Sequence, residues 1–318
     1  MTNAQWILAR RPVDGSPVDD DFRMVETRIP EPGPNQMLTR TIYLSLDPYQ
    51  WGRWRGASNS IGRVCHGRTV SQVLESNLDG YDPGDFIFNT NGWQEYGLTG
   101  DGISAFNYMF PRKIDPSIAP ISTAVGVLGM LGLTAYSGLV LQCQPRSGET
   151  VVVSAASGGV GQVVGQIAKL LGCRVVGIAG IEEKCSFVTE TLGFDACVSH
   201  LSESLVDDLS SACPEGIDIY FESVGGKVFE AVLPVLNQKA RISLCGLISQ
   251  YGNDDIETTF KAWMMEGKEM FARKDILAQR LSVGKFVRDY ESQFLSEMSH
   301  WVQAGQIKYK EDLWTGLE

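Results

Sequence analysis

A short glycine-rich stretch and two tyrosines are the residues whose types and spacing could do chemistry in this sequence. From Ala156 the chain reads A-S-G-G-V-G, a G-x-G-x-x-G fingerprint in which alanine replaces the first glycine. Gly158 would let the backbone approach a pyrophosphate, and Gly161 would let the following helix pack closely on the preceding strand. The start of that helix would offer N–H groups and a positive dipole to the anion. A tight strand-to-helix turn that binds nothing is the alternative.

The residues around this turn favour a dinucleotide. An apolar strand precedes it, and four more strand-like runs follow in order. Behind the turn, apolar residues recur at helical spacing; they are Val160, Val163, Val164, Ile167, Leu170 and Leu171. This context predicts a nucleotide-binding sheet rather than an isolated turn.

The second strand of this region, CRVVGIAG, ends without a carboxylate at Ala179 and Gly180. In NAD-binding proteins an acid ~20 residues after the glycine turn binds the ribose hydroxyls, and it would repel the extra phosphate of NADP. Lys184 and His200 could supply positive charge at the same edge. The acids at 182–183 are expected in the first turn of the next helix, where the helix dipole favours them. We therefore predict NADP over NAD.

Tyr49 and Tyr251 are candidate hydrogen-bond donors to a substrate oxygen. Tyr49 lies in a loop, YLSLDPYQWGRWRG, that also carries tryptophans and arginines. Tyr251 follows the fifth strand, at the edge where ligands of such sheets bind. An aromatic side chain that only plugs a loop is the alternative for each. Thr134, in GLTAY, either lines a nicotinamide pocket or caps the start of a helix.

The residues that several other catalytic mechanisms require are missing from the sequence. His66 follows Cys65, but the first 122 residues hold no other histidine or cysteine, and a catalytic zinc needs three protein ligands; we therefore expect no metal. None of the ten tyrosines has a lysine four positions later, and no G-x-S-x-G turn occurs. A hydride donor without a metal Lewis acid suits an alkene conjugated to a carbonyl.

Composition limits the partners and the compartment. With 318 residues, 43% of them hydrophobic, the chain can form two domains. Its net charge of -11 argues against nucleic acid or an anionic membrane as the main partner. No run approaches the ~20 apolar residues of a membrane span, and the N-terminus lacks a signal-peptide pattern. The seven cysteines are scattered, as in reduced proteins, so a cytoplasmic location is expected.

The pattern of expected secondary structure changes near residue 125. Before it, short β-leaning runs such as QMLTRTIYLSL, RTVSQVLES and DFIFNT predict a mostly antiparallel β domain. After it, strands and helices alternate, which predicts a doubly wound parallel sheet of the α/β class. The expected strands are 150–155, 174–179, 196–199, 217–222 and 240–245, and the expected helices are 159–171, 182–192, 203–213 and 227–236. From about Ile256, charged helical segments including EGKEMFARKDILAQRL are expected to pack back on the first domain.

Six segments, in their order and spacing, resemble the zinc-free medium-chain dehydrogenase/reductases, and most closely the bacterial curcumin reductase and prostaglandin reductase (leukotriene hydroxydehydrogenase) branch. They are YLSLDPY, GDFIFNTNGWQEY, LGMLGLTAYSGL, ASGGVGQVVGQIAKLLGCRVVGIAG, GIDIYFESVGGKVFEAVLP and CGLISQY. The resemblance implies a GroES-like β domain (1–122), a Rossmann domain (123–256) and a return segment (257–318). It also implies NADPH and reduction of the C=C bond of α,β-unsaturated ketones and aldehydes, usually by a homodimer. A quinone oxidoreductase and a non-catalytic NADPH-binding protein remain alternatives.

The resemblance also implies roles for individual residues. Tyr49 would polarise the substrate carbonyl, and Ser223 stands where the family commonly has an asparagine that contacts the cofactor. The residues implied for the cofactor are Gly158, Val160 and Gly161 at the pyrophosphate, Lys184 at the 2′-phosphate with His200 near it, and Cys245, Leu247 and Tyr251 at the nicotinamide. The chain stops at KEDLWTGLE, where relatives continue through a further helix and strand, so the C-terminus is expected to be incomplete.

Overall fold

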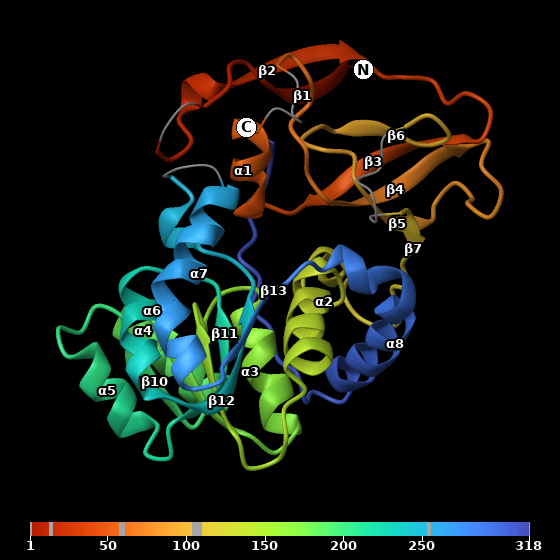
Figure 1. Cartoon of the computed structure of the whole chain (residues 1–318). Coiled ribbons are helices and arrows are strands. Elements are labelled where there is room, and N and C mark those ends of the chain that lie inside the picture. The colour runs from red at the N-terminus through yellow and green to blue at the C-terminus, as the bar shows by residue number, and fades with distance from the viewer. Residues whose placement is uncertain (1, 13–14, 57–60, 104–109, 253–255, 318) are drawn as a thin grey trace. The chain divides into compact units, whose positions relative to one another are not determined.

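The computed structural model describes residues 2–12, 15–56, 61–103, 110–252 and 256–317. It divides into two compact units (Figure 1). The first unit is Met1–Gly129 with Asp312–Glu318, and the second is Met130–Glu311. Part of the loop that follows Tyr49, residues 57–60, lies outside the described residues.

The first unit is built on antiparallel strands, as the sequence predicts. A five-stranded sheet has the order β6-β3-β4-β5-β7, and β1 and β2 form a separate pair. The strands are β1 (Thr2–Leu8), β2 (Phe22–Arg28), β3 (Gln36–Leu44), β4 (Thr69–Ser76), β5 (Phe86–Asn89), β6 (Tyr96–Gly100) and β7 (Arg112–Lys113). One α-helix, α1 (Tyr49–Arg55), and the 3-10 helices Asp19–Asp21 and Ile121–Val125 complete the unit.

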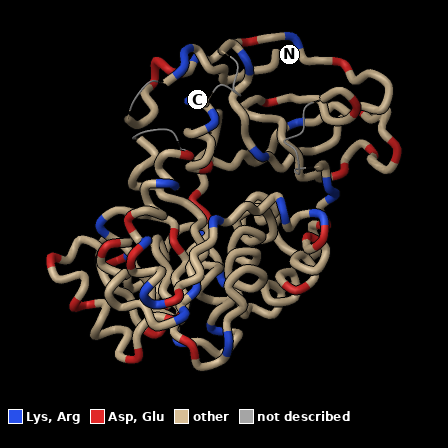
Figure 2. Tube along the Cα trace, viewed as in Figure 1, with Lys and Arg blue, Asp and Glu red and all other residues tan. Residues whose placement is uncertain are grey.

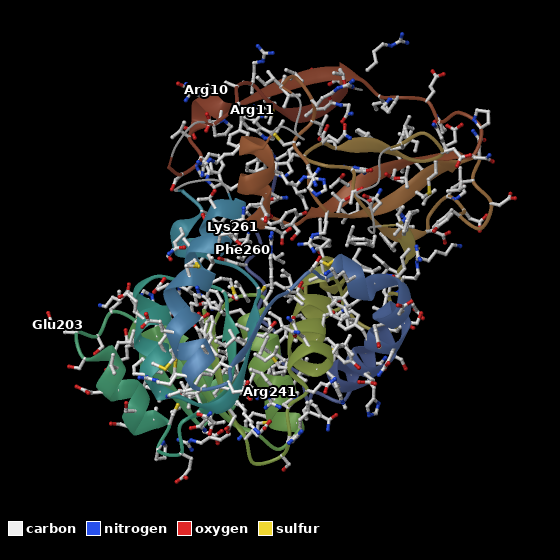
Figure 3. The ribbon with its side chains drawn as sticks, viewed as in Figure 1. Arg10, Arg11, Glu203, Arg241, Phe260 and Lys261 are labelled. Carbon is white, nitrogen blue, oxygen red and sulfur yellow. The ribbon has the colours of Figure 1, made fainter. Side chains whose placement is uncertain are left out.

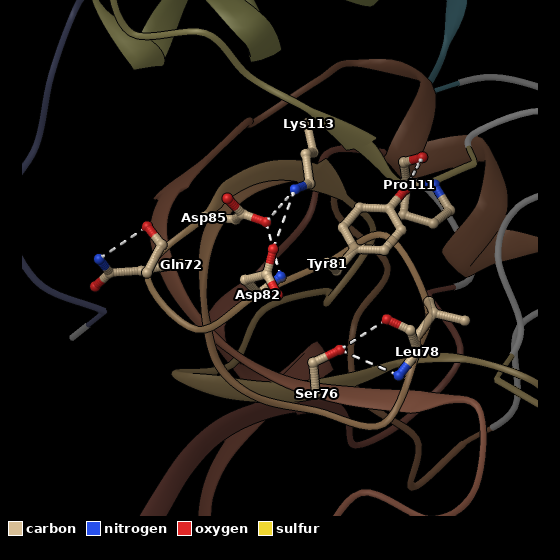
Figure 4. Close-up of polar contacts among 9 residues, drawn as sticks. Gln72, Ser76, Leu78, Tyr81, Asp82, Asp85, Pro111 and Lys113 are labelled. Atoms are coloured by element: carbon tan, nitrogen blue, oxygen red, sulfur yellow. Dashed lines mark hydrogen bonds and ion pairs between the residues drawn. The ribbon is translucent and has the colours of Figure 1, made fainter.

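Polar contacts fasten the short strand β7 to the turn between β4 and β5 (Figure 4). Lys113 pairs with Asp85 at 2.6 Å, and the hydroxyl of Tyr81 donates to the carbonyl of Pro111 at 2.9 Å. A strand of two residues can form few backbone hydrogen bonds with its neighbour. The side-chain contacts therefore help to hold β7 at the edge of the sheet.

The second unit is a six-stranded parallel sheet with helices on both sides (Figure 1). Its strand order, β10-β9-β8-β11-β12-β13, is that of a doubly wound nucleotide-binding fold. The strands are β8 (Thr150–Ser154), β9 (Arg174–Ala179), β10 (Ala196–Ser199), β11 (Ile217–Glu222), β12 (Leu236–Leu244) and β13 (Leu277–Arg280). The α-helices are α2 (Met130–Tyr136), α3 (Gly161–Leu170), α4 (Glu182–Ser186), α5 (Leu205–Ala212), α6 (Lys227–Val232), α7 (Ile256–Arg273) and α8 (Gly284–Gln303).

Shorter helical turns extend several of these helices. The π-helical turns Ser137–Cys143 and Phe187–Thr191 continue α2 and α4, and the 3-10 turn Leu233–Val235 continues α6. A separate 3-10 turn, Ile248–Gln250, follows β12. All five strands and all four helices expected between residues 150 and 245 are therefore present. Their largest difference is β12, which begins four residues earlier than expected.

The segment EGKEMFARKDILAQRL is only partly helical, which corrects the sequence expectation. Helix α7 ends at Arg273, and Asp275 adopts a left-handed φ of 52° that turns the chain. Leu277–Arg280 form β13, which pairs in parallel with β12. Arg280 on this strand lies 3.9 Å from the ring centroid of Phe260 on α7, so helix and strand pack together; Figure 3 labels Phe260.

The return segment also differs from expectation, because α7 and α8 belong to the second unit and not to the first. The Trp263 ring of α7 lies 4.3 Å from that of Phe229 on α6, and Phe294 of α8 lies 5.8 Å from Tyr136 on α2. The apolar faces of α7 and α8 are therefore buried against other helices of the second unit. Only Asp312–Glu318 belongs to the first unit, where Trp6 donates to the carbonyl of Leu317 at 2.6 Å.

Charge is distributed along both units, with acidic and basic residues interspersed (Figure 2). Arg241 on β12, labelled in Figure 3, pairs with Glu149 before β8 at 2.5 Å. Among the described residues, the helices lack the length and apolarity that crossing a bilayer requires.

All seven cysteines lie in the described part of the chain and are free thiols. Burial is the main cause that raises the pKa of five of them, so these stay protonated at neutral pH. The pKa values are about 12 for Cys65, Cys143 and Cys245, and about 11 for Cys173 and Cys213.

Candidate cofactor and substrate sites

The glycine turn has the geometry that a dinucleotide pyrophosphate requires. Strand β8 ends at Ser154, Ala155 turns the chain with a left-handed φ of 49°, and α3 begins at Gly161. A Cβ on Gly161 would lie 2.3 Å from the carbonyl oxygen of Ala155, and one on Gly158 would lie 3.1 Å from the same atom. Side chains are thus excluded where the helix start meets the loop. The N–H groups of Gln162 and Val163, in the first turn of α3, donate to the carbonyls of Gly158 and Val160, at 3.0 Å each. The positive end of the α3 dipole, at Gly161, suits an anion.

A buried carboxylate supports the neighbouring turn after β11. Glu222 has no exposed surface, and its Oε1 accepts bonds from the N–H groups of Val224 at 2.7 Å and Gly225 at 3.1 Å. The hydroxyl of Ser154 donates to the same oxygen at 3.1 Å and accepts the N–H of Ser223 at 2.7 Å. Burial raises the pKa of Glu222, and these hydrogen bonds oppose the rise.

Sequence reasoning missed Glu222. Its signal was present, since a carboxylate ends the strand IDIYFE directly after three apolar or aromatic residues. Such a group is retained in a core only when hydrogen bonds satisfy it. Through it, the ends of the adjacent strands β8 and β11 hold the Ser223 turn in one shape.

The structure brings Gly180 and His200 together at the ends of β9 and β10. The N–H of His200 donates to the carbonyl of Ala179 at 2.8 Å, and a Cβ on Gly180 would lie 3.3 Å from Nε2 of His200. Lys184 is exposed one turn into α4. The acids at 182–183 are exposed in the first turn of the same helix, which confirms that prediction. The end of β9 is therefore neutral, with a lysine and a histidine near it.

The residues expected at the nicotinamide cluster after β12. Cys245 interacts with the side chain of Ser223, and the N–H of Cys245 donates to the carbonyl of Glu222 at 2.8 Å. The hydroxyl of Tyr251 lies over Gly246, where a Cβ would be 2.7 Å from it. Burial is the main cause that raises the pKa of Tyr251 to about 12.

Two residues of the expected cofactor set, Leu247 and Thr134, have buried side chains. Leu247 has no exposed surface, and its side chain packs in the core, where a Cβ on Gly225 would come within 2.8 Å of it. Thr134 does not cap a helix start, because it lies inside α2 and donates to the carbonyl of Met130 at 2.6 Å. This bond to the preceding turn is common for threonine in a helix interior.

Tyr49 is the first residue of helix α1, not of an irregular loop as the sequence suggested. Its phenolic oxygen lies 2.8 Å from Nε2 of His66, and the guanidinium carbon of Arg68 lies 5.4 Å from the centre of its ring. Arg68 in turn forms a buried ion pair with Asp47 at 2.5 Å. The chain thus folds back after α1 so that the residues leading into β4 meet the helix start.

His66 is electrically neutral in this surrounding. Burial lowers its pKa to about 3, and the charges of Arg53 and Arg68 lower it further in the same direction. Sequence reasoning considered His66 only as a metal ligand and missed its contact with Tyr49. Within the described ranges, no group of three or more histidine, cysteine, aspartate or glutamate side chains could hold a metal ion.

Fold and sites together define a two-domain, dinucleotide-dependent oxidoreductase. A family model described as the N-terminal domain of oxidoreductase matches residues 4–106, and one described as zinc-binding dehydrogenase matches residues 159–296. The chain belongs to the medium-chain dehydrogenase/reductase family, in the branch of the curcumin reductases and prostaglandin reductases.

Individual relatives resemble the chain over almost its whole length. It is 44% identical to the NADPH-dependent curcumin reductase of Escherichia coli (strain K12), over 99% of this chain and 90% of that protein. It is 38% identical to the NADP(+)-dependent 2-alkenal reductase of Nicotiana tabacum, over 100% and 92%. The crystal structure of CurA from Vibrio vulnificus in complex with NADPH matches with a TM-score of 0.86 and 42% identity, over 99% and 92%.

Proposed function

We propose that the protein catalyses the NADPH-dependent reduction of the C=C bond of α,β-unsaturated ketones and aldehydes. The observation that carries the proposal is the glycine turn combined with a β9 strand that ends, at Ala179 and Gly180, without a carboxylate. Relatives at 44% and 38% identity are named as NADPH-dependent curcumin reductase and 2-alkenal reductase, which supports the choice of both cofactor and bond.

The residues proposed to hold NADPH follow strands β8, β9, β10, β11 and β12 of the second unit, with one more on helix α2. Gly158, Val160 and Gly161 would hold the pyrophosphate at the start of α3. Lys184 and His200 would pair with the 2′-phosphate, since both are exposed near the neutral end of β9. The residues proposed around the nicotinamide are Thr134, Ser223, Cys245, the Leu247 backbone and Tyr251. When bound, NADPH supplies the hydride that reaches the β-carbon of the substrate.

Tyr49 is proposed to donate a hydrogen bond to the substrate carbonyl oxygen as negative charge develops on it. A neutral His66 can donate from Nε2 to the Tyr49 oxygen, which directs the phenolic hydrogen toward the substrate. A donor aimed at a developing oxyanion contributes about 3 kcal/mol in comparable sites. Tyr251 is the second proposed donor, and its raised pKa keeps it protonated at neutral pH.

Mixing the protein with NADPH and a simple enone tests the proposal, with the products identified by mass and NMR. Loss of the alkene with the carbonyl retained is the expected result. Loss of the carbonyl, or reduction of quinones only, would support the quinone oxidoreductase instead. NADPH binding without turnover of any enone or quinone would support the non-catalytic alternative.

We also propose that the protein acts as a homodimer in the cytoplasm. The free thiols of all seven cysteines suit a reducing compartment. Light scattering coupled to gel filtration measures the assembly directly, and a monomer at micromolar concentration would contradict the dimer.

A further inference from the structure

Two cysteine side chains meet at the edge of the parallel sheet of the second unit. Cys185 lies on α4, and Cys197 lies on the edge strand β10, beside which α4 packs (Figure 1). The thiol groups of Cys185 and Cys197 form a side-chain hydrogen bond with each other. Both side chains are partly exposed, so a small molecule in solution can reach the two sulfur atoms together.

A glycine makes room for this pair. Gly177 on β9 lies opposite Cys197 in the parallel ladder. A Cβ on Gly177 would lie 3.3 Å from Sγ of Cys197 and 2.8 Å from Cγ1 of Val188, a residue of the π-helical turn that continues α4. The Cys197 side chain and the segment after α4 therefore lie on the same face of the sheet, where a larger residue at position 177 would collide with both.

Helix α4 can approach β10 with little loss of core packing. A disulfide bond is about 2.05 Å long, so the two sulfur atoms must come roughly 1 to 2 Å closer than in a thiol hydrogen bond. Every side chain of α4 is at least partly exposed, whereas β10 is fixed by its ladder with β9. Bond formation would therefore draw α4 toward the strand.

The pair also lies beside the residues proposed to hold the 2′-phosphate. Lys184 directly precedes Cys185 on α4, and His200 directly follows β10. The Cys197 side chain also contacts the backbone of Ala179 at the end of β9. A shift of α4 would therefore move Lys184 relative to His200. Charge-assisted hydrogen bonds depend on geometry, so the phosphate would lose part of its contacts.

We propose that Cys185 and Cys197 are a modification site for peroxides, and that the disulfide they form weakens the binding of NADPH. The effect on NADPH rests on the proposed function, because it assigns the 2′-phosphate to Lys184 and His200. The formation of the disulfide does not depend on that assignment.

The reaction proceeds in two balanced steps. The Cys185 sulfur loses its proton and attacks hydrogen peroxide; the O–O bond breaks, which gives a sulfenic acid on Cys185 and, with that proton, one water. Burial and the neighbouring Cys185 thiol raise the pKa of Cys197 above its usual range, so Cys197 keeps its proton until the second step. Its sulfur then forms the S–S bond, and its proton leaves with the sulfenic oxygen as a second water. The thiols lose two electrons, which the peroxide gains.

Peptide mapping by mass spectrometry tests the modification site in the full-length protein. Reduced protein treated with dilute hydrogen peroxide should contain a disulfide between Cys185 and Cys197, which dithiothreitol should remove. Cys185→Ser and Cys197→Ser should each abolish it. Cys173→Ser, at a buried cysteine whose bond to the carbonyl of Arg146 a hydroxyl can keep, is the matched control and should still form it. Sulfinic or sulfonic acid at Cys185 without the disulfide would overturn the proposal.

Fluorescence titration tests the effect on the cofactor. The Kd of NADPH should rise about tenfold or more in the oxidised wild type and return after dithiothreitol, while the Kd of NADH should change less than about twofold. Peroxide should leave the Kd of NADPH unchanged in the two serine variants of the pair and raise it in Cys173→Ser. An oxidised wild type that binds NADPH as tightly as the reduced protein contradicts the proposal.

A reciprocal measurement uses redox equilibrium instead of affinity. Because coupling between two equilibria is mutual, saturating NADP(+) should shift the equilibrium of the pair with a glutathione buffer toward the thiols by the same factor, and NAD(+) should not. A redox equilibrium that is the same with and without NADP(+) would overturn the coupling.

These experiments separate this proposal from the proposed function. If the reduced protein binds no NADPH, the proposed function fails and the coupling fails with it, while peptide mapping still decides whether the disulfide forms. If the reduced protein binds NADPH and reduces enones, but peroxide yields no disulfide between Cys185 and Cys197, the modification site fails alone.

Discussion

The phenolic oxygen of Tyr49 lies 2.8 Å from Nε2 of His66, and this contact joins the start of α1 to the segment that enters β4. The histidine in this pair is neutral, because burial and two arginines lower its pKa to about 3. The tyrosine therefore has a partner whose protonation does not change at physiological pH.

Replacing Tyr49 with phenylalanine should lower kcat for a simple enone about 100-fold, because the donor to the developing oxyanion is lost. KM should change little, since the ring remains in place. Steady-state kinetics with NADPH measures both. Tyr96→Phe, at a partly buried tyrosine of β6 in the same unit, is the control and should behave as the wild type. A Tyr49→Phe enzyme with unchanged kcat would remove this residue from the mechanism.

The lowered pKa of His66 predicts a loss of stability in acid. Its value in the unfolded chain is about 6.5, so between pH 6.5 and 3 the unfolded state binds more protons than the folded state. The free energy of unfolding should therefore fall as pH falls through this window, by about 1 to 2 kcal/mol at pH 5.

Urea unfolding between pH 8 and 4 measures this effect. His66→Asn should flatten the acid slope, because asparagine does not titrate. His300→Asn, at an exposed histidine in the last turn of α8, should keep the slope. An unchanged slope in His66→Asn would show that other groups cause the acid sensitivity.

Gly180→Asp should convert the cofactor preference toward NADH. A carboxylate at the end of β9 would repel the 2′-phosphate and accept ribose hydroxyls, so the Kd of NADPH should rise about tenfold or more and that of NADH should not. The new Cβ would lie 3.3 Å from Nε2 of His200, which is exposed and has room to shift. Fluorescence titration with both cofactors measures the change.

Lys184→Ala tests the same site by removing a positive charge. It should weaken NADPH about tenfold and leave NADH unaffected, because only the phosphorylated cofactor offers the lysine a partner. Lys261→Ala, on the exposed surface of α7, is the matched control. Equal losses for both cofactors in Lys184→Ala would place this lysine elsewhere than at the 2′-phosphate.

Glu222 should stabilise the protein and support cofactor binding by fixing the shape of the turn after β11. Glu222→Ala removes the acceptor of three hydrogen bonds and should cost about 3 kcal/mol of stability and weaken NADPH binding. Glu222→Gln keeps an oxygen that can accept the same bonds, so it should retain most of both. Denaturant unfolding and cofactor titration separate the two effects. A Glu222→Gln protein as impaired as Glu222→Ala would indicate that the charge itself is needed.

The parallel sheet could be predicted well from the sequence, because short runs of neighbouring residues determine where its strands and helices form. Strand IDIYFE and the turn at Gly161 carry their apolar pattern and glycine within a few residues. Strand β13 was missed because it has only four mostly exposed residues and gains its order from pairing with β12. The contact between Tyr49 and His66 was missed for a similar reason, since 17 residues separate them and only the folded β domain unites them.

The burial of the cysteines has a chemical consequence for an enzyme that reduces activated alkenes. Such compounds alkylate thiolates, the reactive form of cysteine. With the pKa of Cys65, Cys143 and Cys245 raised to about 12, less than about one thiol in ten thousand is ionised at pH 7 at each of these residues. At these three cysteines, the fold thereby protects the sulfur atom from the electrophiles that the enzyme consumes.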